Sequence, residues 1–272
     1  MNKDVVVVIG VGGMGQAIAR RIGSGRQVLL ADFNESTLDG AADLLRGEGH
    51  HVATQVVDVS DADSVHVLAD VAAGLGSVTH VAHTAGLSAV QASTWMILRV
   101  DLLGAALVLD AFQRVVAPGA AAVVIASMAG YMAFGIPADH ERALAVTPAN
   151  DLLSLPFLAP DVVGVPGAAY VLAKRANALR VQAAAGTWGE RGAWVNSISP
   201  GIISTPMGRE ELDGQNGQQM RDMVNMSALR RFGTPDDIAA AAAFLLGPQA
   251  AFISGTDLLV DGGVVAALRT SA

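Results

Sequence analysis

A tyrosine and a lysine lie four residues apart, at Tyr170 and Lys174, in a stretch with helical spacing. Residues at i and i+4 share one face of a helix, which would place a phenol beside an ammonium group. A phenol has an unperturbed pKa of about 10, but a nearby cation favours the phenolate and lowers that pKa. We therefore expect Tyr170 to act as a general acid and base. The alternative is an exposed tyrosine with an unrelated lysine.

A glycine-rich sequence follows the first apolar run of the chain. It matches G-x-G-x-x-G between a predicted strand over 5–9 and a predicted helix over 13–22. Such glycines permit a tight turn and let a pyrophosphate approach the free N–H groups at the start of the helix. The residues expected to bind a dinucleotide here are Gly10, Gly12, Gly13, Met14 and Gly15.

An acidic residue, Asp32, ends the second apolar run, 22 residues after Gly10. A carboxylate at this position can accept hydrogen bonds from the adenosine ribose, and it would repel a ribose phosphate. No arginine lies in the glycine loop or beside Asp32, which is followed by Phe33 and Asn34. The sequence therefore predicts NAD(H) in preference to NADP(H), with Asp32 and Phe33 at the adenosine end. The alternative for Asp32 is a carboxylate that caps the next helix.

A second class of protein fits this half of the chain. Methyltransferases that use S-adenosylmethionine also place a glycine loop after the first strand and an acid after the second. The Tyr170 and Lys174 pair is the feature that favours a dehydrogenase over a methyltransferase.

Short apolar runs alternate with stretches of helical period along the whole chain. The predicted strands span 5–9, 27–31, 52–57, 78–82, 121–126, 194–198 and 257–260, and the predicted helices 13–22, 35–46, 62–73, 91–116, 168–188 and 235–246. This alternation predicts an α/β fold of the Rossmann type, a doubly wound, seven-stranded parallel sheet with helices on both faces. No break in composition marks a second domain, so residues 1–272 are expected to form one.

The composition is that of a soluble globular protein, with 52% hydrophobic and 15% charged residues among 272. The formal net charge of −8 argues against nucleic acid as a partner, because phosphates call for basic patches. A chain without cysteine has no disulfide and no cysteine zinc site, and His80 and His83 should point to opposite faces of a strand, so no metal is expected. Prolines and glycines interrupt the uncharged stretch over 115–138, so no membrane helix is expected, and the lack of cysteine fits the reducing cytoplasm, where we expect the protein.

With these motifs the sequence resembles the short-chain dehydrogenase/reductase family over nearly its whole length. Ser127, in Ile125-Ala126-Ser127-Met128, resembles the family's catalytic serine. The segment NSISPGIISTPM, residues 196–207, resembles the one that turns over the nicotinamide. The cofactor contacts that the resemblance adds are Asp58, Val59, Thr84, Ala85, Gly86, Pro200, Gly201, Ile203 and Thr205.

The resemblance implies a role for each catalytic residue. Tyr170 exchanges a proton with the substrate oxygen and Ser127 orients that oxygen. Lys174 binds the nicotinamide ribose and lowers the pKa of Tyr170, so that Tyr170 and Lys174 also contact the cofactor. The implied reaction is hydride transfer between NAD(H) and a secondary alcohol or ketone, in a homodimer or homotetramer. A non-catalytic NAD(H)-binding regulator is the alternative, since a dinucleotide fold does not imply catalysis.

Two positions depart from the family pattern. His83 and Thr84 stand where the family commonly has two asparagines, and Asp101 stands where it has a catalytic asparagine that holds a water in a proton relay to the lysine. An ionised aspartate accepts hydrogen bonds but cannot donate them. Asp101 is a candidate for the relay, and the alternative is a helix carboxylate that caps or pairs with an arginine such as Arg99.

An insertion precedes Tyr170, which lies 43 residues after Ser127, much farther than in most relatives. The extra residues, about 131–167, are apolar and contain four prolines, so we expect a poorly helical segment that forms a lid or a subunit interface. A similar insertion in a bacterial hydroxysteroid dehydrogenase/carbonyl reductase branch points to a hydrophobic, steroid-like substrate. A second segment, about 206–231, resembles the family's mobile substrate loop.

Overall fold

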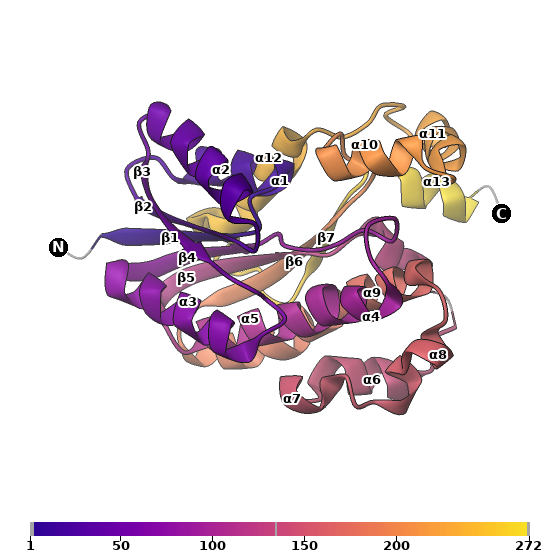
Figure 1. The fold of residues 1–272 in the computed structure, drawn as a ribbon, viewed down its shortest axis with the longest axis horizontal. Helices are drawn as coiled ribbons and strands as arrows, with labels where there is room; N and C mark the ends of the chain where they lie inside the picture. The colour runs from indigo at the N-terminus through magenta and orange to yellow at the C-terminus, as the bar shows by residue number, and fades with distance from the viewer. Residues whose placement is uncertain (1–2, 134, 271–272) are drawn as a thin grey trace.

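Seven parallel strands form the centre of the computed structural model, which describes residues 3–133 and 135–270 (Figure 1). Their order across the sheet is β3-β2-β1-β4-β5-β6-β7. The strands are β1 (Asp4–Ile9), β2 (Gln27–Asp32), β3 (His51–Val56), β4 (Ser77–His83), β5 (Val116–Ile125), β6 (Trp194–Pro200) and β7 (Asp257–Val260). The predicted doubly wound sheet is confirmed, and each predicted strand is present.

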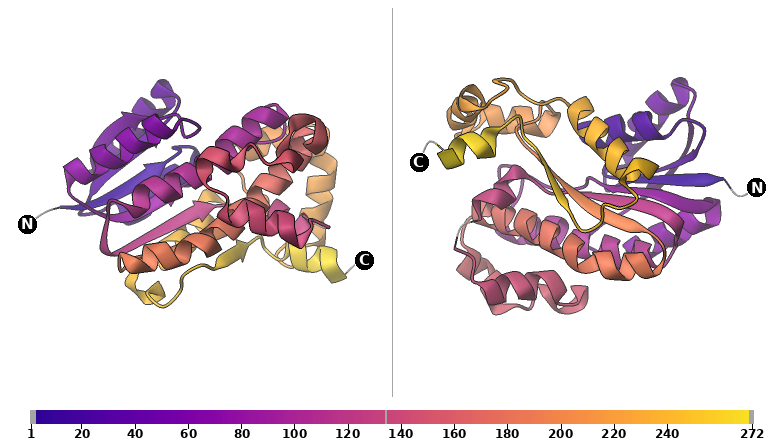
Figure 2. Two further views of the ribbon diagram at one scale, coloured as in Figure 1. Left: turned by 90° about the horizontal axis from the view of Figure 1, so that it is seen from below. Right: turned by 180° about the vertical axis from the view of Figure 1, so that it is seen from behind.

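Helices cover both faces of the sheet (Figures 1 and 2). One face carries α1 (Gly13–Ile22), α2 (Glu35–Gly47) and α12 (Pro235–Leu246), and the other carries α3 (Ala62–Leu75), α5 (Gly104–Gln113) and α9 (Pro166–Glu190). In β1, Val5 and Val7 pack with the α3, α5 and α9 layer, whereas Val6 and Val8 pack with the opposite layer. Burial on both faces explains why this strand is a continuous apolar run.

The bounds of the helix predicted over 91–116 are wrong at both ends. The side chain of Ser93 accepts a hydrogen bond from the Met96 N–H, so the first helix, α4 (Thr94–Ile97), begins after Gln91. A π-helical turn, η1 (Leu98–Leu103), joins α4 to α5, and Val116 already pairs with Val78 in the sheet. Within the uncharged stretch over 115–138, residues 116–125 form the strand β5, and no helix of residues 3–133 and 135–270 is both long and apolar enough to cross a membrane.

The insertion forms short helices, so the expectation of a poorly helical segment is wrong. After η2 (Met128–Met132) come α6 (Ala138–Val146), α7 (Ala149–Leu152), η3 (Pro156–Leu158) and α8 (Pro160–Val163). The prolines begin these helices instead of breaking them, because a residue at or before the first helical position needs no N–H donor. Phe134, within the insertion, lies outside the described residues.

The helices of the insertion lie on the outer side of α9, away from the sheet (Figures 1 and 2). Leu144 and Leu152 are fully buried in the core that α9 shares. Arg180 of α9 donates through Nη1 to the carbonyl oxygens of Leu144 and Thr147, both at 2.9 Å. Residues 138–152 therefore form an additional packed layer, and they do not cover the carboxyl ends of the strands.

The predicted substrate loop is also helical. It contains α10 (Pro206–Asp213) and α11 (Gly217–Met226), and the chain continues through α12, η4 (Pro248–Ala250) and β7 to α13 (Val264–Thr270). Met220 and Met223 of α11 pack in an apolar cluster with Val264 and Val265 of α13. These methionines hold α11 on the body of the protein.

Candidate active site

The predicted site residues gather at the carboxyl ends of the strands, around the point where the strand order reverses between β1 and β4. Ligands of open parallel sheets bind in this crevice. The segments that reach it are the glycine loop after β1, Asp32 at the end of β2, residues 84–86 after β4, Ser127 after β5 and residues 201–205 after β6.

The glycine loop has the shape that a pyrophosphate needs. Gly10 has a φ of +91°, which favours glycine, and a Cβ on it would run into the backbone of Ala85. A Cβ on Gly15 would collide with the carbonyl oxygen of Gly10, whereas one on Gly12 would meet nothing within 4 Å. Strand and helix thus approach closely, while the surface at Gly12 stays open beside the free N–H groups of α1. The loop fits a dinucleotide.

Asp32 is fixed beside this loop. Its Oδ2 accepts from the Val11 N–H at 2.8 Å and its Oδ1 from the Asn34 N–H at 2.9 Å. A carboxylate has about four acceptor positions, so two remain for ribose hydroxyls. Asn34 and not Asp32 caps α2, by accepting from the Thr37 N–H, which contradicts the helix-cap alternative. Phe33, the next residue, is 75% exposed.

The other predicted cofactor contacts after β3 and β4 have structural partners. Asp58 Oδ1 accepts from both the N–H and the hydroxyl of Ser60, each at 2.8 Å, and Val59 is buried. Thr84 donates through Oγ1 to the Gly10 carbonyl at 2.6 Å, which ties the β4 loop to the glycine loop. Met14, a predicted contact in the first turn of α1, packs its side chain against the core beneath that helix. These residues shape the crevice as well as bordering it.

The segment after β6 folds back towards the glycine loop. Pro200 ends the strand, and a Cβ on Gly201 would lie 2.6 Å from the backbone of Asp261. Ile203 is buried, and the side chain of Thr205 caps α10. The Thr205 methyl group lies 3.2 Å from where a Cβ on Gly13 would be, so this segment faces the phosphate end of the crevice.

The predicted catalytic side chains come together below this crevice. Lys174 Nζ lies 5.4 Å from the centroid of the Tyr170 ring, one turn away on α9. Ser127 follows β5, and its Oγ accepts from the Ala129 N–H at 3.1 Å, which leaves the hydroxyl proton free to be donated. The nearby Ser127 hydroxyl lowers the pKa of Tyr170, so the two side chains are neighbours.

A buried ion pair joins Lys174 to Asp101, which stands on the π-helical turn η1. Nζ and Oδ2 are 3.0 Å apart, and the two side chains are 6% and 0% exposed. Asp101 Oδ1 also accepts from the Leu87 N–H at 2.8 Å. The alternative that paired Asp101 with an arginine is wrong, because Arg99 reaches the carbonyl of Ser60 instead. π-helical turns occur frequently at functional sites, and here one aims the carboxylate at Lys174.

The pKa of Tyr170 is raised overall. Burial is the largest cause, and the charge of Asp101 raises the pKa further. Lys174 lowers it, as predicted, but its contribution does not outweigh burial, so the expectation of a net lowering is wrong for the protein alone. For Lys174, burial lowers the pKa, but the negative charges of Asp101 and Tyr170 raise it by more. The pKa of Lys174 is therefore raised overall, and Lys174 stays cationic.

For two titratable residues of the site, His83 and Glu211, the sequence motifs predict no function. His83 is buried, and burial and the nearby Lys174 lower its pKa to about 3, so it is a neutral imidazole. Glu211 of α10 is half-buried, and its charge raises the pKa of both Tyr170 and Lys174. No motif marks Glu211, because only the fold of α10 brings it near α9. Among the described residues, no cluster of three acidic or histidine side chains is suited to a metal.

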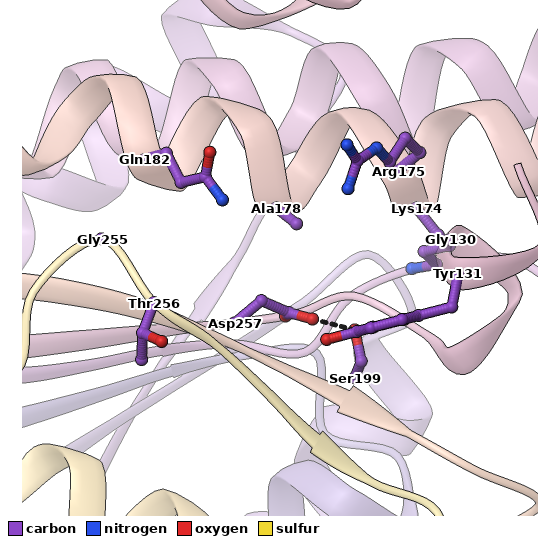
Figure 3. A pocket seen from close by; sticks show the side chains of 10 residues that line it. All are labelled: Gly130, Tyr131, Lys174, Arg175, Ala178, Gln182, Ser199, Gly255, Thr256 and Asp257. Atoms are coloured by element: carbon purple, nitrogen blue, oxygen red, sulfur yellow. Dashed lines mark hydrogen bonds between the residues drawn. The ribbon is translucent and has the colours of Figure 1, made fainter. Parts of the chain in front are cut away.

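A polar cavity of about 270 Å³ adjoins Lys174 between α9 and β7 (Figure 3). Asp257 Oδ2 accepts from the Ser199 hydroxyl at 2.8 Å on its floor. Burial and a hydrogen bond to Asp257 raise the pKa of Tyr131 to about 12, so this phenol stays protonated. The residues that line the cavity are Gly130, Tyr131, Lys174, Arg175, Ala178, Gln182, Ser199, Gly255, Thr256 and Asp257. The cavity shares Lys174 with the candidate site, whereas Ser127 and Tyr170 do not line it.

Family models match both halves of the chain. A model described as short chain dehydrogenase matches residues 3–137, and one described as Enoyl-(Acyl carrier protein) reductase matches residues 141–265. Both describe oxidoreductases, which decides against the methyltransferase alternative.

Relatives match over almost the full length. "Short-chain dehydrogenase/reductase bsc3" of Alternaria brassicicola is 40% identical, over 98% of each chain. "D-threitol dehydrogenase" of Mycolicibacterium smegmatis is 30% identical, over 96% of this chain and 92% of the relative. "3-alpha-hydroxysteroid dehydrogenase/carbonyl reductase" of Comamonas testosteroni is 28% identical, over 98% of each. A solved short-chain type dehydrogenase/reductase from Mycobacterium ulcerans has the same fold, with a TM-score of 0.76, 23% identity, and coverage of 97% of this chain and 90% of that one.

Proposed function

The chain belongs to the short-chain dehydrogenase/reductase family, and we propose that it uses NAD(H) to interconvert a secondary alcohol and a ketone. The family establishes an oxidoreductase that acts on alcohols or ketones. The observation that supports this proposal most directly is the group of Ser127, Tyr170 and Lys174, which meet beside a crevice shaped for a dinucleotide.

The side chains divide the proton chemistry among them. A nicotinamide cofactor held in this crevice would supply the hydride acceptor for oxidation and the hydride donor for reduction. Tyr170 Oη takes the hydroxyl proton during oxidation and gives it back during reduction. Ser127 donates its free hydroxyl proton to the substrate oxygen and fixes that oxygen against Tyr170. The ammonium group of Lys174 has three N–H donors. It forms an ion pair with Asp101 and donates weakly to the Ile125 carbonyl at 3.5 Å, which leaves donors for the nicotinamide ribose.

Asp101 acts through Lys174. Its Oδ1 is held by the Leu87 N–H and its Oδ2 faces Nζ, so both oxygens are engaged within the protein. We assign Asp101 as a positioning residue that fixes the ammonium group of Lys174.

NAD(H) is the preferred cofactor in this proposal because Asp32 presents a carboxylate where NADP(H) would carry its phosphate. No basic side chain is adjacent, since Phe33 and Asn34 follow. A carboxylate that accepts two ribose hydroxyls makes charge-assisted hydrogen bonds, each worth about 1.5–3 kcal/mol.

Replacing Asp32 by asparagine should lower the preference for NADH over NADPH by about tenfold or more. The amide keeps an oxygen that accepts from Val11 but removes the negative charge that excludes a phosphate. Fluorescence titration of both reduced cofactors measures the ratio of their Kd values. Asp43→Asn on the exposed face of α2 is the matched control and should leave the ratio unchanged. An unchanged ratio in Asp32→Asn would refute the assignment.

The proposed substrate is hydrophobic. An apolar cluster lies beyond the ends of β5 and β6, formed by Met128, Ile202, Val224, Val264 and Val265. A steroid-like molecule is supported by the relative from Comamonas testosteroni, whose name specifies a hydroxysteroid. The relative from Mycolicibacterium smegmatis, by contrast, is named for a polyol.

Turnover of a substrate panel tests the function. NADH binding is measured first, and then NAD⁺ reduction with hydroxysteroids, small secondary alcohols and alditols. Oxidation of the apolar alcohols would support the proposal. Activity confined to alditols would agree with the proposed reaction but would refute the proposal that the substrate is hydrophobic. Binding of NADH with no turnover of any member would favour the non-catalytic regulator.

We expect the protein to be a cytoplasmic homodimer. The insertion covers the outer side of α9, a helix through which the family usually associates, and so blocks one of the two interfaces that a tetramer needs (Figure 1). Size-exclusion chromatography with light scattering should give the mass of two chains. A monomer would contradict association altogether, and a tetramer would contradict the blocking role of the insertion.

A further inference from the structure

The helix α10 is anchored beside the glycine loop at its start. The side chain of Thr205 caps α10 by accepting from the Gly208 N–H at 3.0 Å, and its methyl group lies against Gly13 of the glycine loop. A Cβ on Gly208 would run into the carbonyl oxygen of Ile203, so the first turn is fixed on the segment that follows β6. Of the eight residues of α10, all of which the structure describes, only Gly208 is buried. A helix with so few buried contacts opens easily.

The far end of α10 reaches the loop that follows β4. Gln91 Nε2 donates to Glu210 Oε2 at 2.7 Å, although the two residues are 119 positions apart in the chain. A Cβ on Gly214, the residue after α10, would lie 3.8 Å from the Val90 side chain. Gln91 also fixes its own loop, because its Oε1 accepts from the Ser88 N–H at 3.2 Å. One glutamine side chain thus ties the loop after β4 to α10.

The helix α10 therefore crosses the crevice between these two attachment points. The glycine loop, which Thr205 contacts, lies on one side, and the loop after β4 lies on the other. Ala85 lies against Gly10 of the glycine loop, and the same loop continues from Ala85 to Gln91. A dinucleotide held by the glycine loop and by residues 84–86 would consequently lie beneath α10.

We propose that Gln91 and Glu210 form a clasp that holds α10 over the cofactor crevice and controls how fast the cofactor enters and leaves. This inference rests on the proposed function, because it takes the crevice to be the cofactor site. The bond joins an amide to a carboxylate, and hydrogen bonds to charged groups are stronger than neutral ones. Opening of such a covering segment limits turnover in many enzymes, through the release of product. Gln91 and Glu210 are positioning residues, since the clasp acts through α10.

The rate constants of NADH binding and release, measured by stopped-flow fluorescence, test the clasp. Gln91→Glu keeps an acceptor for the Ser88 N–H but sets two carboxylates against each other, so both rate constants should rise about fivefold or more. Because the clasp opens for entry as well as for release, Kd should stay within about twofold of the wild type. The double variant Gln91→Glu, Glu210→Gln restores an amide–carboxylate pair in the reverse direction and should return both rate constants towards the wild type.

A matched control lies on α11, where Gln218 Nε2 donates to Asp222 Oδ1 at 2.9 Å within one helix. Gln218→Glu makes the same change in a pair that does not join α10 to the loop after β4, so both rate constants should stay at their wild-type values. Hydrogen exchange of the α10 amides in the free protein gives a second measurement, which needs no cofactor. Exchange should be faster in Gln91→Glu and should slow again in the double variant.

Three results would overturn the inference. The first is wild-type rate constants and wild-type α10 exchange in Gln91→Glu. The second is a double variant that stays as fast as Gln91→Glu, because the pairing of the two side chains would then be irrelevant. The third is faster dissociation with unchanged association, which indicates a lost cofactor contact instead of a clasp. A wild type that binds neither NADH nor NADPH contradicts the proposed function instead, and the exchange of α10 would still show whether the clasp exists.

Discussion

Tyr170→Phe should lower kcat by about a thousandfold and leave NADH binding within about twofold of the wild type. The phenol is the group that moves the proton, and general acid and base catalysis of this kind contributes about 10²–10⁴ in rate. The aromatic ring and its packing on Lys174 remain, so the cofactor crevice is preserved. Steady-state turnover of the best alcohol of the panel and titration with NADH measure the two quantities.

The second tyrosine of the chain gives the matched control. Tyr131 also lies beside α9, but its hydroxyl bonds to Asp257 in the polar cavity, which Tyr170 and Ser127 do not line. Tyr131→Phe should therefore keep turnover within about twofold. Turnover by Tyr170→Phe above about a tenth of the wild-type value would refute the catalytic assignment.

Lys174→Met should lower the free energy of unfolding by about 3–5 kcal/mol, because it leaves Asp101 buried without its counter-ion. It should also weaken cofactor binding, since the proposed ribose donor is lost. Urea denaturation followed by fluorescence measures the stability. The double variant Lys174→Met, Asp101→Leu should recover most of the loss, because replacing both members of a buried pair by apolar groups is often neutral or stabilising.

The loss in Lys174→Met should depend on pH. Burial already raises the pKa of Asp101 in the wild type, and removal of Lys174 takes away the charge that lowers it. The folded variant then holds a proton at pH values where the unfolded chain has lost it, so its stability falls as the pH rises above the ordinary carboxyl pKa. The deficit should be smaller at pH 5 than at pH 8. A variant as stable as the wild type at pH 8 would show that the ion pair contributes little.

Local patterns in the sequence determined the sheet and the ends of its strands. A strand buried on both faces must be a continuous apolar run, and a dinucleotide turn must have glycine where a Cβ would collide, as at Gly10 and Gly15. Tyr170 and Lys174 were predictable as neighbours because helical spacing alone places residues four apart on one face. These features depend on residues close together in the chain.

Only the tertiary structure decided which charges surround these residues and how deeply their side chains are buried. Asp101 reaches Lys174 from 73 residues away, and the charge of Glu211, on the helix that follows β6 in the chain, raises the pKa of Lys174. The prolines of the insertion look like helix breakers until their positions show them to begin helices that α9 supports through Arg180. The net pKa of Tyr170 depends on burial and on charges from three separate elements. Spacing along the chain carries no information about such sums, because electrostatic energy depends on distance and burial in space.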